Sequence, residues 1–316
     1  MRLILAPMEG LADHFLRRLI TAQGGFDWVV SEFVRVVDRP LPDSVFHRVC
    51  PELLNNGQTA SGTPVRVQLL GNHLDAMAAN AQKAIELGSF GIDLNFGCPS
   101  KTVNRSQGGA ILLREPETLH RVVQAVRQAL PAEVVVSAKM RLGYDDASLM
   151  VENAQAIESA GATELTVHAR TKAQGYAPPA HWDQLAKLAE HIRLPLIANG
   201  DIWTPEDYRR CVSIVGTGDV MLGRGAIRNP DLAARIRNTA ATDKTSWSHL
   251  APLITQFWGE VRQVMPERYC AGRLKQWLNH LRQVHPEAEQ LWQGVRGERD
   301  LERLDQRLQP LTQTTP

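Results

Sequence analysis

Residues 95–110, NFGCPSKTVNRSQGGA, hold a single cysteine in a setting where a thiol can do chemistry. Cys98 stands between Gly97 and Pro99, and the proline keeps the Cys98 backbone out of the helical region. The polar run that follows ends in glycines, which is typical of a loop that can move over a cleft. A free cysteine is most often a small buried hydrophobic side chain. This polar turn, with Lys101 close by, favours a chemical role instead.

A lysine and a histidine stand where the surrounding pattern is apolar. Lys139 lies within VVVSAKMRL, a segment typical of a strand buried on both faces, so its ammonium group needs an anionic partner. His168 lies in HAR at the end of another apolar run. A histidine in such a place is commonly a hydrogen-bonded structural residue, but its position at a strand end favours a functional role.

Glycines follow the last two apolar segments, in NGDI at 199–202 and GRGAI at 223–227. They can simply turn tight corners, or they can let backbone N–H groups approach a phosphate, to which Arg224 adds a forked contact. Flavin mononucleotide (FMN) satisfies both this corner and Lys139. Its phosphate lies at the glycines and its ring spans the cleft, with Lys139 beside the N1/O2 edge that becomes negative on reduction. Gln68 can then bond the pyrimidine edge of the ring.

The elements that must position these residues alternate between short apolar strands and longer amphipathic helices. Patterns such as 73–88 and 116–130 carry apolar residues at three-to-four spacing, with glycine or proline at their ends. Such alternation predicts parallel strands joined by right-handed crossovers. We expect eight strands, at 3–8, 28–33, 65–71, 91–97, 134–143, 164–170, 195–202 and 218–227.

Eight such units predict an α/β fold, the (β/α)8 TIM barrel. The alternative is an open doubly wound sheet, but no GxGxxG motif follows the first strand. The strand ends favour the barrel, because a barrel brings all eight ends to one mouth, where catalytic and cofactor-binding groups belong. The groups at or just after these ends are Met8, Glu9, Glu32, Gln68, Asn95, Cys98, Lys139, Arg141, His168, Arg170, Asn199, Asp201 and Arg224.

The alternation stops after Asn238. Residues 238–248 are typical of a polar linker, and helical patterns at about 249–265, 270–285, 286–295 and 298–309 follow without strands. We therefore predict two domains, a catalytic FMN-binding barrel over residues 1–240 and a small helical domain over residues 241–316. Basic residues gather between positions 262 and 282, where they either form a solvated face or bind an anionic partner: Arg262, Arg268, Arg273, Lys275 and Arg282, against Glu267 alone in that stretch.

Composition excludes several classes of protein. A net charge of +1 over 316 residues rules out a basic surface spread over the whole molecule, so any nucleic-acid contact must be local. No apolar run approaches the roughly 20 residues of a membrane span, and we expect a cytoplasmic protein without membrane contact. The cysteines are too far apart for CxxC pairs, so we expect no metal site and no disulfide framework: Cys50, Cys98, Cys211 and Cys270.

The strand-end segments resemble, in order and over the whole barrel, the signature blocks of the tRNA-dihydrouridine synthases, flavin-dependent enzymes that reduce uridine in tRNA. The FGCPS block is highly specific. The stretches FVRVVD and AGRLKQWLNHLR further resemble a bacterial subgroup whose target is uridine 16 of the D-loop. The barrel blocks are APMEG (6–10), SEF (31–33), VQLLG (67–71), DLNFGCPS (93–100), GGA (108–110), KMRLG (139–143), VHART (167–171), ANGDI (198–202) and GRGAI (223–227).

This resemblance implies a mechanism. Hydride passes from N5 of reduced FMN to C6 of uracil, and a proton reaches C5 from the neutral thiol of Cys98 on the opposite face, with NADPH or NADH as the reductant. Asn95, Lys139, Arg141 and His168 surround the uracil, where donors stabilise charge on its carbonyl oxygens. The FMN contacts that the resemblance implies are Pro7, Met8, Glu9, Gln68, Lys139, His168, Asn199, Gly200, Asp201, Gly223 and Arg224.

The resemblance also implies how tRNA is held. The target base leaves its stack to reach the flavin, and phosphate contacts keep the rest of the tRNA in register. We expect the protein to act as a monomer. The tRNA contacts expected outside the immediate base pocket are Arg35, Tyr176, Arg273, Lys275, His280 and Arg296.

Two other functions remain open from the residues. One is an FMN-dependent reductase of a small-molecule pyrimidine or enone, which leaves the helical domain without a task. The other is a tRNA-binding module without catalysis, which takes up no flavin.

Overall fold

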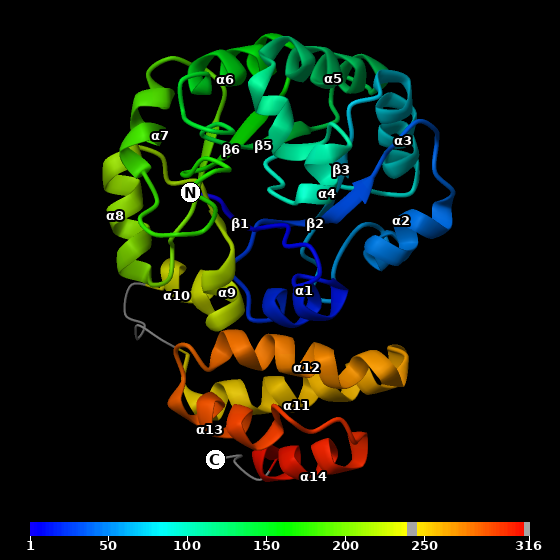
Figure 1. The fold of residues 1–316 in the computed structure, drawn as a ribbon, viewed down its shortest axis with the longest axis vertical. Helices are drawn as coiled ribbons and strands as arrows, with labels where there is room; N and C mark the ends of the chain where they lie inside the picture. The colour runs from blue at the N-terminus through cyan, green and yellow to red at the C-terminus, as the bar shows by residue number, and fades with distance from the viewer. Residues whose placement is uncertain (239–244, 313–316) are drawn as a thin grey trace.

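The computed structural model describes residues 1–238 and 245–312, and its centre is a closed barrel of eight parallel strands (Figure 1). Each strand pairs with the next along the chain, and β8 closes the ring on β1. The predicted (β/α)8 barrel is confirmed, and the open sheet is excluded. The strands are β1 (Leu3–Leu5), β2 (Trp28–Arg35), β3 (Val65–Leu70), β4 (Ile92–Phe96), β5 (Val136–Arg141), β6 (Glu164–His168), β7 (Leu196–Asn199) and β8 (Val220–Leu222).

Amphipathic helices cover the outside of the barrel. In α5, for example, Leu119, Val122, Val123 and Val126 are fully buried, so that one apolar stripe faces the strands. The helices of the barrel are α1 (His14–Thr21), α2 (Asp43–Val49), α3 (Leu74–Glu86), α4 (Lys101–Arg105), α5 (Pro116–Ala129), α6 (Met150–Ser159), α7 (Trp182–Ala189), α8 (Pro205–Val215), α9 (Arg224–Arg228) and α10 (Leu232–Arg237), with 3-10 turns at Pro51–Asn55 and Gly109–Arg114.

The last predicted strand is much shorter than expected. Residues 218–227 were predicted as one strand, but β8 ends at Leu222 and Arg224 begins the short helix α9. Two backbones approach closely at α9, since a Cβ atom on Gly225 would lie 2.0 Å from the carbonyl oxygen of Ile202. Gly225 therefore lets α9 pack directly against the segment that follows β7.

The C-terminal part of the chain is helical, as predicted. The polar linker ends earlier than residue 248, because Trp247 already begins a helix that the Ser246 side chain caps by accepting from the His249 N–H. Linker residues 239–244 lie outside the described residues, and so does the predicted domain boundary between residues 240 and 241. The helices are α11 (Trp247–Val264), α12 (Glu267–Leu281), α13 (Pro286–Val295) and α14 (Leu301–Thr312).

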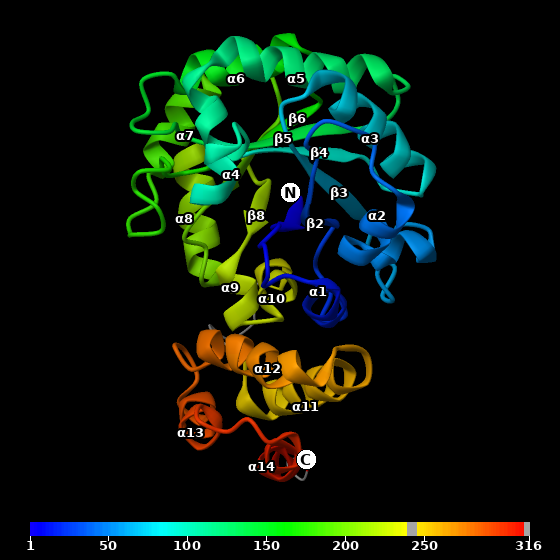
Figure 2. The same ribbon diagram turned by 45° about the vertical axis from the view of Figure 1, so that its right-hand side comes forward.

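Helices α11 and α12 pack beneath α1 and α9, as Figures 1 and 2 both show. Trp277 is completely buried in this contact, edge-on to Phe257 with the ring centroids 4.9 Å apart, and its Nε1–H donates to the carbonyl of Ile227 at 3.0 Å. The helical part is thus packed against the side of the barrel, with α12 beside the end of α9. In the described part of the chain, we find no helix with the length and apolar character that crossing a membrane requires.

Candidate functional site

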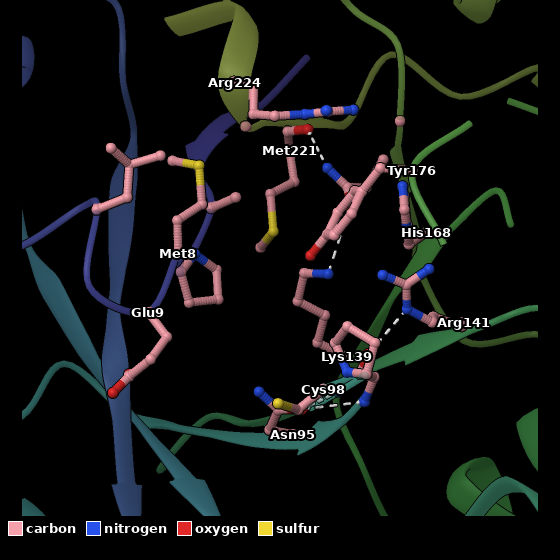
Figure 3. A pocket seen from close by; sticks show the side chains of 18 of the residues that line it. Met8, Glu9, Asn95, Cys98, Lys139, Arg141, His168, Tyr176, Met221 and Arg224 are labelled. Carbon is pink, nitrogen blue, oxygen red and sulfur yellow. Dashed lines mark hydrogen bonds between the residues drawn. The ribbon is translucent and has the colours of Figure 1, made fainter. Parts of the chain in front are cut away.

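A cavity of about 580 Å³ opens at the carboxyl ends of the strands, and Figure 3 shows the side chains that surround it. Lys139 extends toward its middle, with Cys98 and Asn95 on one side and Arg224 on the other. Fifteen of the predicted site residues line this one cavity: Pro7, Met8, Glu9, Gln68, Asn95, Cys98, Lys139, Arg141, His168, Tyr176, Asn199, Gly200, Asp201, Gly223 and Arg224.

The turn that carries Cys98 is held by the side chain of Asn95. The Asn95 Oδ1 accepts from the backbone N–H of Gly97 at 3.0 Å and from that of Cys98 at 2.9 Å. The Asn95 Nδ2 donates to Gln68 Oε1 at 2.7 Å, and the Gln68 Nε2 donates to the buried carboxyl of Asp93 at 2.7 Å. A chain of hydrogen bonds therefore fixes the thiol relative to the barrel interior.

The polar segment after Cys98, predicted as a loop, contains a short helix. Residues Lys101–Arg105 form α4, because Val103 and Asn104 turn inward and are buried. The Asn104 Nδ2 donates to the carbonyls of Cys98 at 2.9 Å and Ser100 at 2.7 Å. Gly109 closes the turn with φ +67°, and a Cβ atom there would meet Cys98 at 2.9 Å. Part of the predicted loop is therefore helical and packed against the protein.

Burial is the largest influence on the Cys98 thiol, and it raises the pKa above the ordinary value. The Glu9 carboxyl adds to the rise, while the Ser100 N–H and the charges of Arg141 and Lys139 oppose it. At neutral pH the group is therefore a thiol and not a thiolate. This suits a proton donor and not a nucleophile.

Lys139 is the most unusual charged group in the cavity. Burial is the largest cause that lowers its pKa, to about 8, and the Arg141 charge lowers it further. Its Nζ donates to Asn199 Oδ1 at 3.4 Å, and among the described residues no carboxylate forms an ion pair with it. A buried ammonium without an anion is costly, so an anionic or strongly polar ligand beside it is favoured.

His168 is a neutral imidazole in this environment. Burial and then the charges of Arg141, Lys139, Arg170 and Arg224 lower its pKa well below the ordinary value. Its Nε2 lies 3.5 Å from Arg170 Nη1. The group can therefore donate or accept a single hydrogen bond without bringing another charge into the cavity.

Three hydrogen bonds of Arg141 go to backbone carbonyls of the protein. Its Nε donates to the Gly97 carbonyl at 2.8 Å, and its Nη1 donates to the carbonyls of Thr171 at 3.1 Å and Gly175 at 2.9 Å. The guanidinium also lies 5.2 Å from the centroid of the Tyr176 ring. Arg141 thus joins the loops after β4 and β6, and Tyr176, which is 54% exposed, covers it.

The segments after β7 and β8 form the corner predicted for a phosphate. The Asp201 carboxylate points away from that corner, because it accepts from Arg170 Nη2 and from the Ala180 N–H. Gly200 has φ +123°, and a Cβ atom there would lie 3.2 Å from the His168 ring, so a larger residue would crowd the cavity. Arg224 points to the same corner (Figure 3) and forms no ion pair in the described chain.

Glu9 is a carboxyl group at the edge of the cavity with an unusual affinity for protons. Burial, and next the charge of Glu32, raise its pKa to about 7. Glu32 itself accepts from the Gly10 N–H at 2.5 Å. Glu9 therefore titrates close to neutral pH.

Five predicted tRNA contacts lie outside the cavity: Arg35, Arg273, Lys275, His280 and Arg296. Arg35 is exposed and its Nη2 donates to Ser106 Oγ at 2.5 Å, whereas Lys275 donates to the Glu298 carbonyl. Arg296 is exposed after α13. Arg273 is different, because it is 7% exposed and its guanidinium binds Asp13 and the Leu11 carbonyl.

Several lining residues escaped prediction, and they are mostly apolar. Phe33 and Met221 belong to strands that the sequence did predict, so their place near a strand end was the available signal. Trp203 follows the predicted NGDI block, and no pattern around it marks it as part of a site. The lining residues that were not predicted include Ala6, Leu11, Phe33, Ile202, Trp203, Met221 and Gly225. In the two described stretches, no His, Cys, Asp and Glu side chains group in threes as a metal site requires.

The sequence matches the dihydrouridine synthase (Dus) family over residues 4–314. It is 49% identical over 311 residues to the tRNA-dihydrouridine(16) synthase of Aquipseudomonas alcaligenes, which covers 98% of this chain and 99% of that protein. It is 50% identical over 296 residues to the enzyme of the same name from Shewanella oneidensis, with 94% of this chain and 93% of that protein covered.

Solved structures with a similar fold share little sequence. One is the old yellow enzyme homologue from Zymomonas mobilis, with a TM-score of 0.54, 14% identity, and coverage of 78% of this chain and 90% of that one. Another is morphinone reductase in complex with tetrahydroNAD, with a TM-score of 0.53, 15% identity, and coverage of 78% and 88%. At this level of identity the likeness shows the barrel fold alone.

Proposed function

Because the chain belongs to the dihydrouridine synthase family, we propose that it is a flavin-dependent enzyme that reduces uridine to 5,6-dihydrouridine in the D-loop of tRNA, at position 16. The observation that carries the chemistry is that one cavity holds both Cys98, a neutral thiol, and Lys139, an ammonium that forms no ion pair with the described residues. The relatives named as tRNA-dihydrouridine(16) synthases support the substrate and the position, since they match over almost the whole chain.

The residues present fit FMN. The cavity volume of about 580 Å³ is in the range of cofactor sites. Neither Lys139 nor Arg224 forms an ion pair within residues 1–238 and 245–312. Gly200 and Gly223 bring backbone to the wall between them. When bound, FMN supplies the hydride that uracil C6 receives, with NADPH or NADH as the external reductant. Contacts to it are proposed for Pro7, Met8, Glu9, Gln68, Lys139, His168, Asn199, Gly200, Asp201, Gly223 and Arg224.

Cys98 is proposed as the acid that gives a proton to uracil C5. Its raised pKa keeps the proton on the sulfur at neutral pH, and Asn95 holds its backbone in place. A positioned acid of this kind contributes roughly 10²–10⁴ in rate.

Charge that develops on the uracil oxygens needs donors. Lys139 and neutral His168 can supply these hydrogen-bond donors, since neither is bound to a carboxylate in the described chain. Arg141 contributes chiefly by holding the turn of Cys98 and by its positive charge, because three of its N–H contacts go to backbone carbonyls.

Contacts to the rest of the tRNA are proposed for Arg35 and Tyr176 near the cavity and for the helical part of the chain. Arg296 is exposed and Lys275 partly so, and both can therefore meet phosphates. Arg273 already donates to Asp13 through Nε and Nη2. It can contact a phosphate only through N–H groups that these bonds do not use.

The deciding experiment maps dihydrouridine at each D-loop position of tRNA from a strain that lacks this protein. Loss at position 16, restored by the wild-type gene and not by the Cys98→Ala gene, is expected. Unchanged tRNA overturns the proposal and leaves the small-molecule reductase. If position 16 is lost but the Cys98→Ala gene restores it, the assignment of Cys98 is wrong.

A second measurement addresses the cofactor. The purified protein is expected to be yellow and to release FMN on denaturation. Colourless protein that takes up no FMN but still binds tRNA supports a binding module without catalysis.

A further inference from the structure

Two arginines and a histidine stand between the cavity and the helical part of the chain. Arg224 and Arg228 belong to α9, and His280 belongs to α12, which packs against α9. Arg224 also lines the cavity, whereas Arg228 and His280 lie outside it. The group therefore extends from the cavity rim to α12 in the C-terminal part of the chain.

Trp203 organises this group. The Arg224 guanidinium carbon lies 5.2 Å from the centroid of the Trp203 ring, and that of Arg228 lies 4.2 Å from it. Two guanidinium groups against one indole are held close together in spite of their mutual repulsion. Trp203 lines the cavity and Arg228 does not, and neither is among the proposed FMN contacts.

Protein carboxylates do not neutralise this group. Within residues 1–238 and 245–312, Arg224, Arg228 and His280 form no ion pair. Arg228 Nη2 donates to the neutral side chain of Gln283, and the Arg228 carbonyl contacts His285 Nε2 at 2.9 Å. The charge of Asp201 acts on Arg224, but the Asp201 carboxylate is already bound to Arg170.

Unused polar atoms mark the same place. Arg228 Nε and His280 Nδ1 are buried and lack a hydrogen-bond partner in the described chain. Burial lowers the pKa of both groups, and the neighbouring arginines lower that of His280 further. Buried polar atoms are normally satisfied, so two unsatisfied nitrogens on neighbouring side chains favour a polar ligand at this place.

We propose that Arg228 and His280, with Trp203 as the platform for Arg228, bind a backbone phosphodiester of the RNA substrate next to the nucleotide whose base enters the cavity. This inference rests on the proposed function and adds Arg228 and Trp203 to it. Arg228 brings a positive charge from the barrel, and His280, whose lowered pKa leaves it neutral at pH 7, brings a ring nitrogen from α12. A phosphate between them fixes the RNA to both parts at once.

The phosphate of FMN is the other anion with the same chemistry. Arg224 lines the cavity and suits it, whereas Arg228 lies outside the cavity lining, one helical turn farther along α9. The separation favours one anion for Arg224 and a second for Arg228 and His280.

The test uses FMN-loaded enzyme and unmodified tRNA, with binding measured by fluorescence anisotropy over a range of salt concentrations. Arg228→Gln should weaken tRNA binding by about tenfold. It should also reduce the slope of log Kd against log salt by about one, because one phosphate contact is lost. FMN affinity, measured by quenching of flavin fluorescence, should stay within about twofold.

Arg114→Gln is the matched control. Arg114 also lies over an aromatic ring, with its guanidinium carbon 4.3 Å from the Tyr144 centroid, but it pairs with Asp145 at 2.6 Å. This variant should leave tRNA binding and its salt slope unchanged. Arg228→Lys is a second variant for the case that Arg228→Gln does not fold. It keeps the charge without the forked geometry and should bind tRNA with intermediate affinity.

The outcomes separate this site from the proposed function. Unaltered tRNA binding by folded Arg228→Gln overturns the site while wild-type binding upholds the function. A fall in FMN affinity with tRNA binding unchanged assigns the group to the flavin phosphate and also overturns it. Wild-type enzyme that binds no tRNA overturns both.

Discussion

The Oδ1 atom of Asn95 accepts hydrogen bonds from the backbone N–H groups of Gly97 and Cys98, at 3.0 and 2.9 Å. A single amide group thereby fixes the turn that presents the thiol, and its Nδ2 ties that turn to Gln68 on β3. The sulfur is thus placed by groups that do not themselves need to react.

Cys98→Ala should leave FMN binding and flavin reduction by NADPH intact and lower the rate of uridine reduction by roughly 10²–10⁴, because the proton donor is lost. Stopped-flow absorbance of the flavin measures the two half-reactions separately. Cys211→Ala is the control, since Cys211 is a buried thiol on α8 outside the cavity. Full turnover by the Cys98 variant would show that the proton comes from another group.

Lys139→Met should make the reduction potential of bound FMN more negative, because an ammonium beside the ring favours its reduced, anionic form. The pKa of Lys139 is about 8 in the flavin-free protein, and an anionic ring beside it raises that value. Above pH 8, reduction therefore takes up one extra proton in the wild type. That proton adds about 30 mV per pH unit to the slope for a two-electron couple.

Dye-coupled redox titration between pH 7 and pH 10 measures both effects of Lys139. The variant should lack the steeper region above pH 8. Equal potentials and equal slopes in the two proteins would place Lys139 away from the ring.

Glu9 predicts a dependence of stability on pH. Its folded-state pKa of about 7 lies above the ordinary 4.5, so the folded protein binds more protons than the unfolded chain between these values. The contribution of Glu9 to stability therefore falls as pH rises from 4.5 through 7. Glu9→Gln should gain stability relative to the wild type over that window.

Urea unfolding of the flavin-free protein at pH 5 and pH 8 measures this difference for Glu9→Gln. Glu117→Gln, at an exposed position on α5, is the control and should show no such trend. A constant difference between wild type and Glu9→Gln at the two pH values would contradict the prediction.

Arg273→Leu should destabilise the protein by roughly 3–5 kcal/mol, because it leaves the Asp13 carboxylate without its partner in a buried contact. Asp13→Asn keeps a side-chain oxygen that caps α1 by accepting from the Leu16 N–H. The two changes together should lower the free energy of unfolding by less than the sum of the single changes. Unfolding of the four proteins gives this coupling. Additive losses would mean that the two residues act independently.

The exposed pair Arg114 and Asp145 is the comparison for that double-mutant cycle. Its side chains are 52% and 63% exposed, so its coupling should stay below about 1 kcal/mol.

Much of the architecture was legible in the sequence. Apolar segments alternating with amphipathic ones specified the number and order of the eight strands. A short apolar run is typical of a buried strand, and apolar residues at three-to-four spacing are typical of a helix that buries one side. The same logic brought Cys98, Lys139 and His168 together, since parallel strands in a closed barrel end at one mouth.

Other features depended on residues far apart in the chain. The sequence marks Arg273 as one of several basic residues, and only folding places it against Asp13, 260 positions away. Likewise, a charge such as that of Arg228 has a partner or lacks one only once the whole chain surrounds it. Local pattern therefore determined the elements and the mouth of the barrel, and tertiary packing decided which charges are already satisfied and which are left for a ligand.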